Sequence, residues 1–360
     1  MKNRFLLTPC LLLIVCVSLF SQEKKDIIKK TKNAFQSEQF QLFGYGQVIA
    51  NYSEYPDRGQ VRTTAHSSID VARAILFATG RLGERRQFGY MLMYDFGPNA
   101  CLHELYGEWL PVDALNVRFG QYKVPFTLEN PMSPTRIETI YFSRSASAMS
   151  GSAGDFNQYN PNGTLGSVKA GRDAGLQVSG KFLKKNDFFR LEYYAGLFNG
   201  TGFNTKDNND RKDFIGTAYY QPIKGLRLGG SVYSGKLYYG LNDTAPEDHV
   251  RNRLTFGTEY QSKYVYGRSE YITANDGGLK RKGYYTSLVY KLGPGKWEVL
   301  GKYDFYDANT SVSRNETTDI TAGINYYFAP FSRLQLNYIV TDDKALGKNN
   351  AIATQLQLFF

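Results

Sequence analysis

The chain has 360 residues, of which 28 are Tyr, 24 are Phe and 35 are Gly, and only 21% are charged. Tyr and Phe favour strands and Gly permits turns, so this composition favours an all-β protein. The formal net charge of +10 is compatible with nucleic acid, anionic lipid or anionic solutes. No basic cluster forms a nucleic-acid footprint, so we expect no nucleic-acid partner. No internal apolar run approaches the roughly 20 residues of a membrane helix.

The N-terminal region is typical of a secretory signal. Residues 5–20 read FLLTPCLLLIVCVSLF, and this apolar run follows Lys2 and Arg4. A basic head, an apolar middle and a small residue before a polar stretch define such a signal. We predict that residues 1–21 are a signal peptide and that cleavage falls near Ser21–Gln22.

Two other interpretations of the N-terminal region remain open. One is a lipoprotein signal with Cys16 as the lipidated residue, although Val15 is bulky where such sites favour a small residue. The other is an N-terminal membrane anchor, for which the apolar run is short. Residues 22–38 are predicted to form a short polar periplasmic segment. Beyond the signal, Cys101 is the one remaining cysteine, so an exported chain of this kind has no internal disulfide.

From residue 39 onward the chain divides into sixteen segments of roughly ten residues, many of which alternate apolar with polar or small residues. Segments of this length suit tilted strands that cross the hydrocarbon of a membrane. The sixteen segments are 39–52, 67–82, 86–96, 101–110, 115–122, 172–183, 187–198, 213–220, 226–239, 251–261, 263–274, 281–292, 296–308, 317–328, 333–342 and 351–360.

The last segment, AIATQLQLFF, shows the alternation most clearly. Successive side chains of a strand point to opposite faces, and Gln355 and Gln357 fall on the polar face. The apolar face carries Ile352, Leu356, Leu358 and Phe360. A charge that faces lipid near the bilayer centre costs roughly 2–4 kcal/mol, so apolar faces are predicted to meet lipid and polar faces to line the inside. We expect this strand to direct membrane insertion through the barrel-assembly machinery.

The connections between segments predict how the strands are arranged. Every second connection is short and the others are longer, for example 199–212, 275–280 and 342–350, with 97–101 as the exception. Barrels of the outer membrane have tight turns at one end and loops at the other. Backbone groups in a bilayer must be paired internally, which strands achieve only in a closed barrel. Residues 39–360 are therefore predicted to form a 16-stranded antiparallel transmembrane β-barrel, wide enough for an aqueous channel.

The connection from 123 to 171 is far longer than any other. A long stretch without secondary structure is usually functional, and a sixteen-stranded pore must be narrowed to become selective. We predict an inward-folded constriction loop that carries the cations Arg136 and Arg144. The alternative is an ordinary extracellular loop with solvated arginines.

The sequence offers no catalytic or metal-binding pattern. His66, His103 and His249 fall in or beside loops, and neither a G-x-S-x-G motif nor a metal-ligand spacing is present. We therefore expect no enzymatic activity, no metal and no cofactor. A barrel enzyme of the outer membrane and a binding or adhesion barrel remain alternatives, although the latter should have long loops and most connections here are short.

Five stretches resemble, in order, the phosphate-selective porins of Gram-negative outer membranes. The stretches are DVARAILFATGRLG (70–83), YMLMYDF (90–96), VRFGQYKVPFTLEN (117–130), SPTRIETIYFSRS (133–145) and GRDAGLQVSG (171–180). The resemblance implies a sixteen-stranded channel in the outer membrane, usually a homotrimer, whose basic lining passes small anions such as phosphate. The positions that match the family as pore-constriction or anion-contacting residues are Arg73, Asp95, Lys123, Arg136, Arg144 and Arg172.

The segment 67–82 departs from the family pattern. Ala72 and Ile75 stand where the family often has arginine, and Arg73 shares its strand parity with the apolar Val71 and Phe77. A guanidinium offers a planar fork to phosphate oxygens and stays charged, whereas a lysine acts as a point charge. The predicted function is therefore a passive diffusion channel that prefers anions, with a general or weakly selective porin as the alternative.

Overall fold

The computed structural model describes residues 37–55, 65–98, 100–150, 171–239, 247–293 and 295–360. The predicted signal peptide and all but the last two residues of the predicted segment 22–38 lie outside these ranges. Among the residues described, no helix combines the length and the apolar character needed to cross a membrane.

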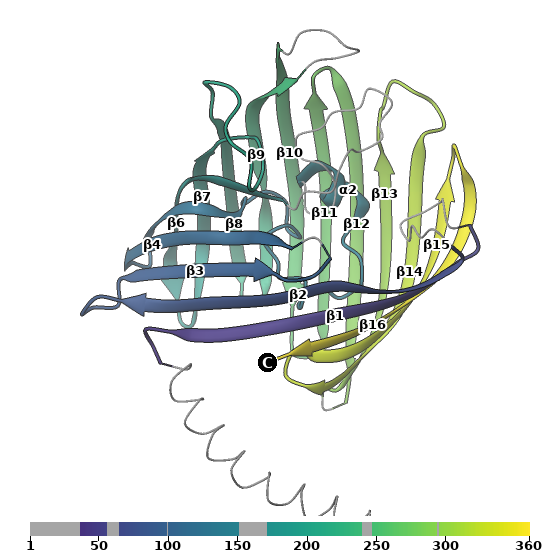
Figure 1. Ribbon diagram of the computed structural model, residues 1–360, viewed down its shortest axis with the longest axis horizontal. Coiled ribbons are helices and arrows are strands. Elements are labelled where there is room, and N and C mark those ends of the chain that lie inside the picture. Colours follow the sequence, from purple (N-terminus) through teal and green to yellow (C-terminus); the bar gives the residue numbers. More distant parts are fainter. Residues whose placement is uncertain (1–36, 56–64, 99, 151–170, 240–246, 294) are drawn as a thin grey trace, which may run out of the picture.

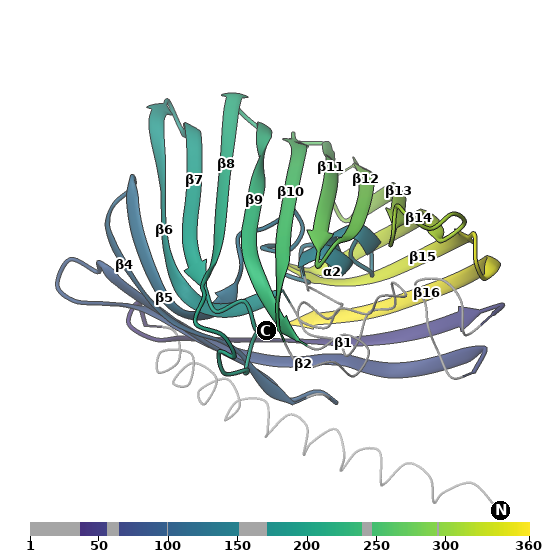
Figure 2. The same ribbon diagram turned by 90° about the horizontal axis from the view of Figure 1, so that it is seen from above.

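Sixteen antiparallel strands form a closed barrel in chain order (Figures 1 and 2). The barrel closes where β1 pairs with β16, with Tyr45 opposite Phe359. The strands are β1 (Gln41–Ser53), β2 (Ser67–Leu82), β3 (Phe88–Asp95), β4 (Cys101–Val112), β5 (Leu115–Lys123), β6 (Arg172–Lys185), β7 (Phe188–Phe198), β8 (Asp213–Ile223), β9 (Leu226–Tyr239), β10 (Glu247–Gln261), β11 (Val265–Asp276), β12 (Leu279–Leu292), β13 (Trp297–Asp307), β14 (Glu316–Ala329), β15 (Ser332–Asp343) and β16 (Gly347–Phe359). Each predicted segment overlaps one strand, and the predicted fold is confirmed.

The two faces of the sheet separate as the alternation predicts. On β16, Ile352 and Leu358 are 43% and 46% exposed on the outside, whereas Gln355 and Gln357 are 2% and 0% exposed on the inside. The same pattern holds along β15, where apolar residues face outward and polar residues inward. An outer face of this kind is suited to contact with an apolar medium such as lipid, because exposing so much apolar surface to water would cost free energy.

Strand β2 contains a bulge that explains its mixed parity. Gln47 of β1 pairs with Arg73, but the next residue, Val48, pairs with Val71, so Ala72 is an extra residue. A bulge of one residue reverses the alternation beyond it. Val71 is accordingly 48% exposed on the outside, while Arg73 donates to the inward-facing Gln47 at 2.8 Å.

Two connections predicted to be long are tight turns, and that prediction was wrong. Strands β11 and β12 are joined only by Gly277 and Gly278, both with positive φ (62° and 92°). Such a two-residue turn matches the twist of the flanking strands. Strands β15 and β16 are joined by residues 344–346. Here the ladder extends through polar residues that sequence propensity assigns to loops.

The connection after β5 folds into the barrel, as predicted, over the part that the structure describes. It includes one helix, α2 (Arg144–Ser150), which contacts β11, β12 and β13 from inside (Figure 2). An apolar core forms between this connection and the wall, and it includes Phe126, Met149, Phe198 and Tyr285. Residues 124–150 are hereafter called the constriction loop; residues 151–170 of the predicted loop lie outside the described ranges.

Candidate functional site

Buried ion pairs hold the constriction loop against one side of the lumen. Glu129 accepts hydrogen bonds from the backbone N–H and the hydroxyl of Ser143, at 2.7 and 2.8 Å. Arg268 of β11 lies 3.6 Å from Glu129 and 2.7 Å from Glu138, and Lys302 of β13 lies 3.9 Å from Glu129. Burial raises the pKa of the Glu138 carboxyl, and the Arg268 charge opposes this rise. The pairing compensates charges that would be costly to bury alone.

Side chains of β14 and β15 satisfy the backbone of the loop. Asn325 and Gln335 donate to the carbonyl of Glu138 at 3.0 and 2.9 Å. Arg333 donates to the carbonyl of Ile137 at 2.6 Å, and Asn337 accepts from the N–H of Ile140 at 2.8 Å. A loop inside a barrel has no strand partner, so these bonds supply the pairing that its buried backbone requires.

Arg144, one of the predicted site residues, belongs to this attachment. It is the first residue of α2, and its guanidinium lies 2.7 Å from the Asp319 carboxylate of β14. Its backbone N–H donates to Asp304 of β13. Arg253 of β10 donates to the carbonyl of Met149 near the other end of the helix. The Arg144 guanidinium is therefore paired with the barrel wall at β14.

Four predicted site residues lie on the opposite side of the lumen, on β2 to β6. Lys123 and Arg172 are directly opposite in the β5–β6 register, and Arg73 of β2 donates to Gln47 of β1. Arg172 pairs with Glu104 at 2.9 Å. Lys123 donates to the carbonyl of Met132 and so fixes the start of the constriction loop.

Asp95, the fourth of these residues, binds backbone N–H groups. Its carboxylate accepts from the N–H groups of Ala74 and Gly97, at 3.0 and 2.8 Å. His103 lies 3.8 Å from the same side chain. These contacts tie β2 to the connection between β3 and β4, which is a structural role.

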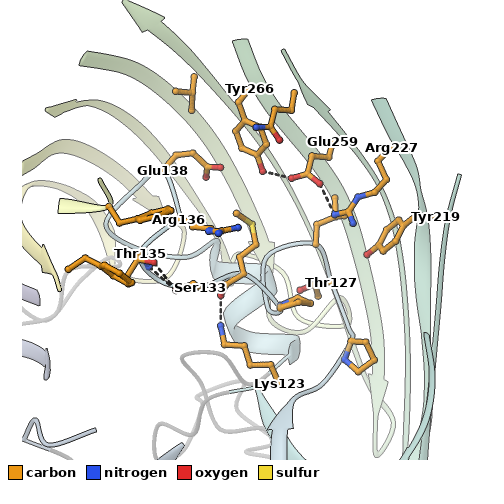
Figure 3. A pocket seen from close by; sticks show the side chains of 18 of the residues that line it. Lys123, Thr127, Ser133, Thr135, Arg136, Glu138, Tyr219, Arg227, Glu259 and Tyr266 are labelled. Atoms are coloured by element: carbon orange, nitrogen blue, oxygen red, sulfur yellow. Dashed lines mark hydrogen bonds and ion pairs between the residues drawn. The ribbon is translucent and has the colours of Figure 1, made fainter. Parts of the chain in front are cut away.

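A cavity of about 1190 Å³ lies between the constriction loop and the end of the barrel that carries the short turns. Lys123 and Arg136, at the two ends of the segment 123–136, both line it. Figure 3 shows Arg136 reaching into this space opposite the wall that carries Arg227 and Glu259. We call this space the vestibule.

Two arginines of the vestibule wall were missed by the sequence reasoning. Arg118 lies 2.8 Å from Glu108 and 4.2 Å from the ring centre of Tyr106. Arg227 lies 2.6 Å from Glu259 and stacks in the same way on a tyrosine, Tyr219, at 4.3 Å. Both ion pairs join residues directly opposite on neighbouring strands. Opposite charges inside adjacent strand segments were the available signal.

Three cations of the vestibule have no ion pair with any residue that the structure describes: Lys123, Arg136 and Lys291. Of the carboxylates that line the vestibule, Glu138 and Glu259 are ion-paired, and Glu298 accepts a hydrogen bond from Asn325 at 3.2 Å. Glu298 has no ion pair among the described residues, so three unpaired cations face one unpaired carboxylate and the unpaired charge is positive on balance. A fixed charge in a water-filled passage acts on ions within roughly 8–10 Å at physiological salt.

The described part of the chain contains no group of three or more His, Cys, Asp or Glu side chains placed to hold a metal ion. That the protein catalyses no reaction stays a prediction.

A closed sixteen-stranded barrel with an apolar outer face and a polar lumen, narrowed by an inward loop, defines a porin. Residues 257–360 match the family Phosphate-selective porin O and P, which confirms the family resemblance. The match covers the last strands of the barrel, whereas the resembling stretches lie within 67–184. The protein is thus an outer-membrane channel of a Gram-negative bacterium. A search of curated proteins found no match.

Solved structures of three other bacterial proteins share the fold. The outer-membrane channel DcaP of Acinetobacter baumannii has 14% identity and a TM-score of 0.60, with 89% of this chain and 97% of that chain covered. Salmonella typhi OmpF has 13% identity and a TM-score of 0.63, with the same coverage. OmpT of Vibrio cholerae has 10% identity and a TM-score of 0.57, with 89% and 99% covered. At these identities the likeness establishes the fold alone.

Proposed function

We propose that the protein is a passive diffusion channel that prefers small anions, phosphate among them, over cations. One observation carries the proposal: Lys123 and Arg136 face the vestibule from the two ends of one loop segment, and neither is ion-paired with a described residue. Two of the three vestibule carboxylates, Glu138 and Glu259, are by contrast paired with arginines, and only Glu298 has no ion pair with a described residue. An anion in the vestibule therefore meets more available positive than negative charge.

The chemistry of these cations suits transient contact. Arginine presents two parallel N–H donors to the oxygens of a carboxylate or phosphate, and lysine acts as a point charge. Conduction requires binding strong enough for entry and weak enough for release. Two cations separated along a wet passage, with Lys291 on the facing wall, meet that requirement better than one deep site.

The test is the reversal potential of purified protein in planar bilayers across a KCl gradient. We expect a reversal potential whose sign corresponds to a channel that is more permeable to chloride than to potassium. Potassium preference would contradict the anion proposal, and a protein that inserts but conducts no current would contradict the channel itself. Replacing chloride by phosphate in the same membrane then measures whether phosphate permeates.

A weakly selective porin is the second candidate, and the charge pairing on the vestibule wall favours it. Arg118 and Arg227 each have a glutamate partner within 3 Å, so neither contributes an uncompensated charge. If this pairing dominates, the permeability ratio of chloride to potassium is close to one. The reversal potential distinguishes the two candidates directly.

We further propose that the channel assembles as a homotrimer and is inserted through its C-terminal strand. The structure of OmpT from Vibrio cholerae is described as a trimer form, which supports the first part. The outward-facing Ile352, Leu356, Leu358 and Phe360 offer an apolar edge to lipid and to an assembly factor. Native mass spectrometry in detergent tests the trimer, and deletion of Phe360 with measurement of outer-membrane yield tests the second part.

A further inference from the structure

Four phenylalanines form one connected group inside the barrel: Phe43 of β1, Phe77 of β2, Phe359 of β16 and Phe331 of the turn between β14 and β15. Phe43 and Phe77 stack with ring centres 5.4 Å apart. Phe359 lies 6.3 Å from Phe77 and 5.4 Å from Phe331. We call this group the aromatic cluster. It lies where the strands begin and end at the short turns, which is the periplasmic end of such a barrel.

The aromatic cluster is open to the vestibule. Phe77, Phe331 and Phe359 line the vestibule, and Phe331 is 41% exposed. Packing across the β1–β16 closure accounts for contacts among the rings of the strands. It does not account for Phe331, which belongs to a turn and extends the apolar surface into a water-filled space. Exposed apolar surface that is concave and bordered by polar groups is typical of ligand-binding sites.

Arg136 completes the arrangement at the edge of the aromatic cluster. Its guanidinium carbon lies 5.5 Å from the ring centre of Phe331. The Arg136 side chain is exposed and has no ion pair with a described residue. The loop next to it is bound to the barrel wall, because Gln357 of β16 donates to the carbonyl of Thr135 at 3.2 Å. A fixed cation therefore stands next to an open apolar surface.

We propose that the vestibule binds anions that carry an aromatic ring, with aryl carboxylates as the ligand class. The ring packs on Phe331 and its neighbours, and the carboxylate contacts Arg136. The inference rests on the proposed anion preference and adds the ligand class to it. Inorganic anions gain only the charge contact, so ring-bearing anions bind more tightly and pass more slowly.

Block of the chloride current by three probes tests the proposal: phenylacetate, acetate, and 2-phenylethylammonium as a cation with the same ring. We expect half-block by phenylacetate at a concentration about two- to tenfold below that of acetate, the range that corresponds to one aromatic contact. The phenylethylammonium cation should block least. Equal half-block by phenylacetate and acetate, or block by phenylethylammonium as strong as that by phenylacetate, would overturn the proposal.

Variants locate the site. Phe331 has φ 58°, and Asn tolerates that conformation, so Phe331→Asn removes the ring and keeps the turn. We expect Phe331→Asn and Arg136→Gln each to remove most of the difference between phenylacetate and acetate. Phe77→Leu is the second variant if Phe331→Asn does not fold. The controls are Phe119→Leu and Arg211→Gln. Phe119 is 71% exposed on the outer face, and Arg211 pairs with Asp248 at 3.2 Å outside the vestibule.

The reversal potential of the same channels in KCl separates this proposal from the proposed function. Anion preference together with equal block by phenylacetate and acetate contradicts the aromatic site alone. Potassium preference contradicts the proposed function, whatever the block shows. A difference between the probes that persists in both Phe331→Asn and Phe77→Leu would also overturn the site.

Discussion

The two halves of the lumen wall use inward-facing charge in different ways. On β11 to β15, several charges bind the constriction loop: Arg268 pairs with Glu129 and Glu138, and Arg333 donates to the carbonyl of Ile137. On β5 and β9, Arg118 and Arg227 pair instead with glutamates of neighbouring strands. The difference shows that a charged side chain that faces the lumen does not necessarily contact a solute. A lumen charge is available to a solute only if no neighbouring residue of opposite charge already pairs with it.

The largest effect is expected where the loop attachment is broken. Arg268→Met leaves Glu129 and Glu138 buried without their main partner, and loss of one member of a buried pair costs about 3–5 kcal/mol. The constriction loop should leave the wall, so single-channel conductance should rise. The measurement is conductance in planar bilayers. Arg211→Met, at an exposed pair, is the matched control, and unchanged conductance in Arg268→Met would show that the loop does not restrict flow.

The next effect contrasts the two faces of β6. Leu176 is 47% exposed on the outside, and Gln177, the next residue, is 3% exposed and lines the vestibule. Leu176→Arg should lower the free energy of unfolding by about 2–4 kcal/mol, whereas Gln177→Arg points into the lumen, away from lipid, and should lower it by less. Urea titration in lipid vesicles measures both. Equal destabilisation would mean that the outer face does not contact lipid.

A smaller effect should distinguish two arginines of the constriction loop. Arg136→Gln and Arg144→Gln each remove one positive charge, but only Arg136 lacks an ion pair among the described residues. One charge contact of about 1 kcal/mol corresponds to roughly a fivefold change in a ratio of permeabilities. Arg136→Gln should lower the chloride-to-potassium ratio by up to that amount, and Arg144→Gln should leave the ratio nearly unchanged. Reversal potentials of both variants decide, and a larger drop in Arg144→Gln would refute the distinction.

The smallest effect concerns the bulge in β2. Removing Ala72 leaves Val71 outside and Arg73 inside, because the bulge is the single residue that breaks the alternation. Deletion of Ala72 should therefore be tolerated, with a loss of stability below about 1 kcal/mol. Deletion of Ala74 would remove the bulge in another way, with Ala72 turned inward and Arg73 turned outward, and should cost about 2–4 kcal/mol because a charge then faces lipid. The yield of folded protein in the outer membrane measures both deletions.

The sequence predicted the barrel well because lipid and water impose one rule on every strand. Alternation of apolar and polar residues located all sixteen strands, and the charge of a residue in mid-strand gave its face. It could not place the bulge at Ala72, because the mixed parity of residues 67–82 does not indicate which residue is the extra one. It also assigned residues 275–280 to a long connection, since Asn, Asp and Gly resemble a loop even where they continue a ladder.

The candidate site was only partly predictable. Arg136 follows from the long connection and Lys123 from the family resemblance, but nothing local in the sequence indicates that Arg144 has a partner 175 residues away, at Asp319. Nor does it tell that Asp95 serves backbone N–H groups. The aromatic cluster brings β1, β2 and β16 together through the closure of the barrel, which places residues more than 300 positions apart in contact. To predict contacts across the closure of the barrel, one would need to know the register of every strand in between.

The charge-reversed variants Lys123→Glu and Arg136→Glu, measured beside the wild type across one KCl gradient, test most directly whether uncompensated vestibule cations set the selectivity. The wild type should prefer chloride, each variant should shift the reversal potential toward potassium, and the double variant should shift it furthest. A double variant with the reversal potential of the wild type would contradict this assignment of selectivity.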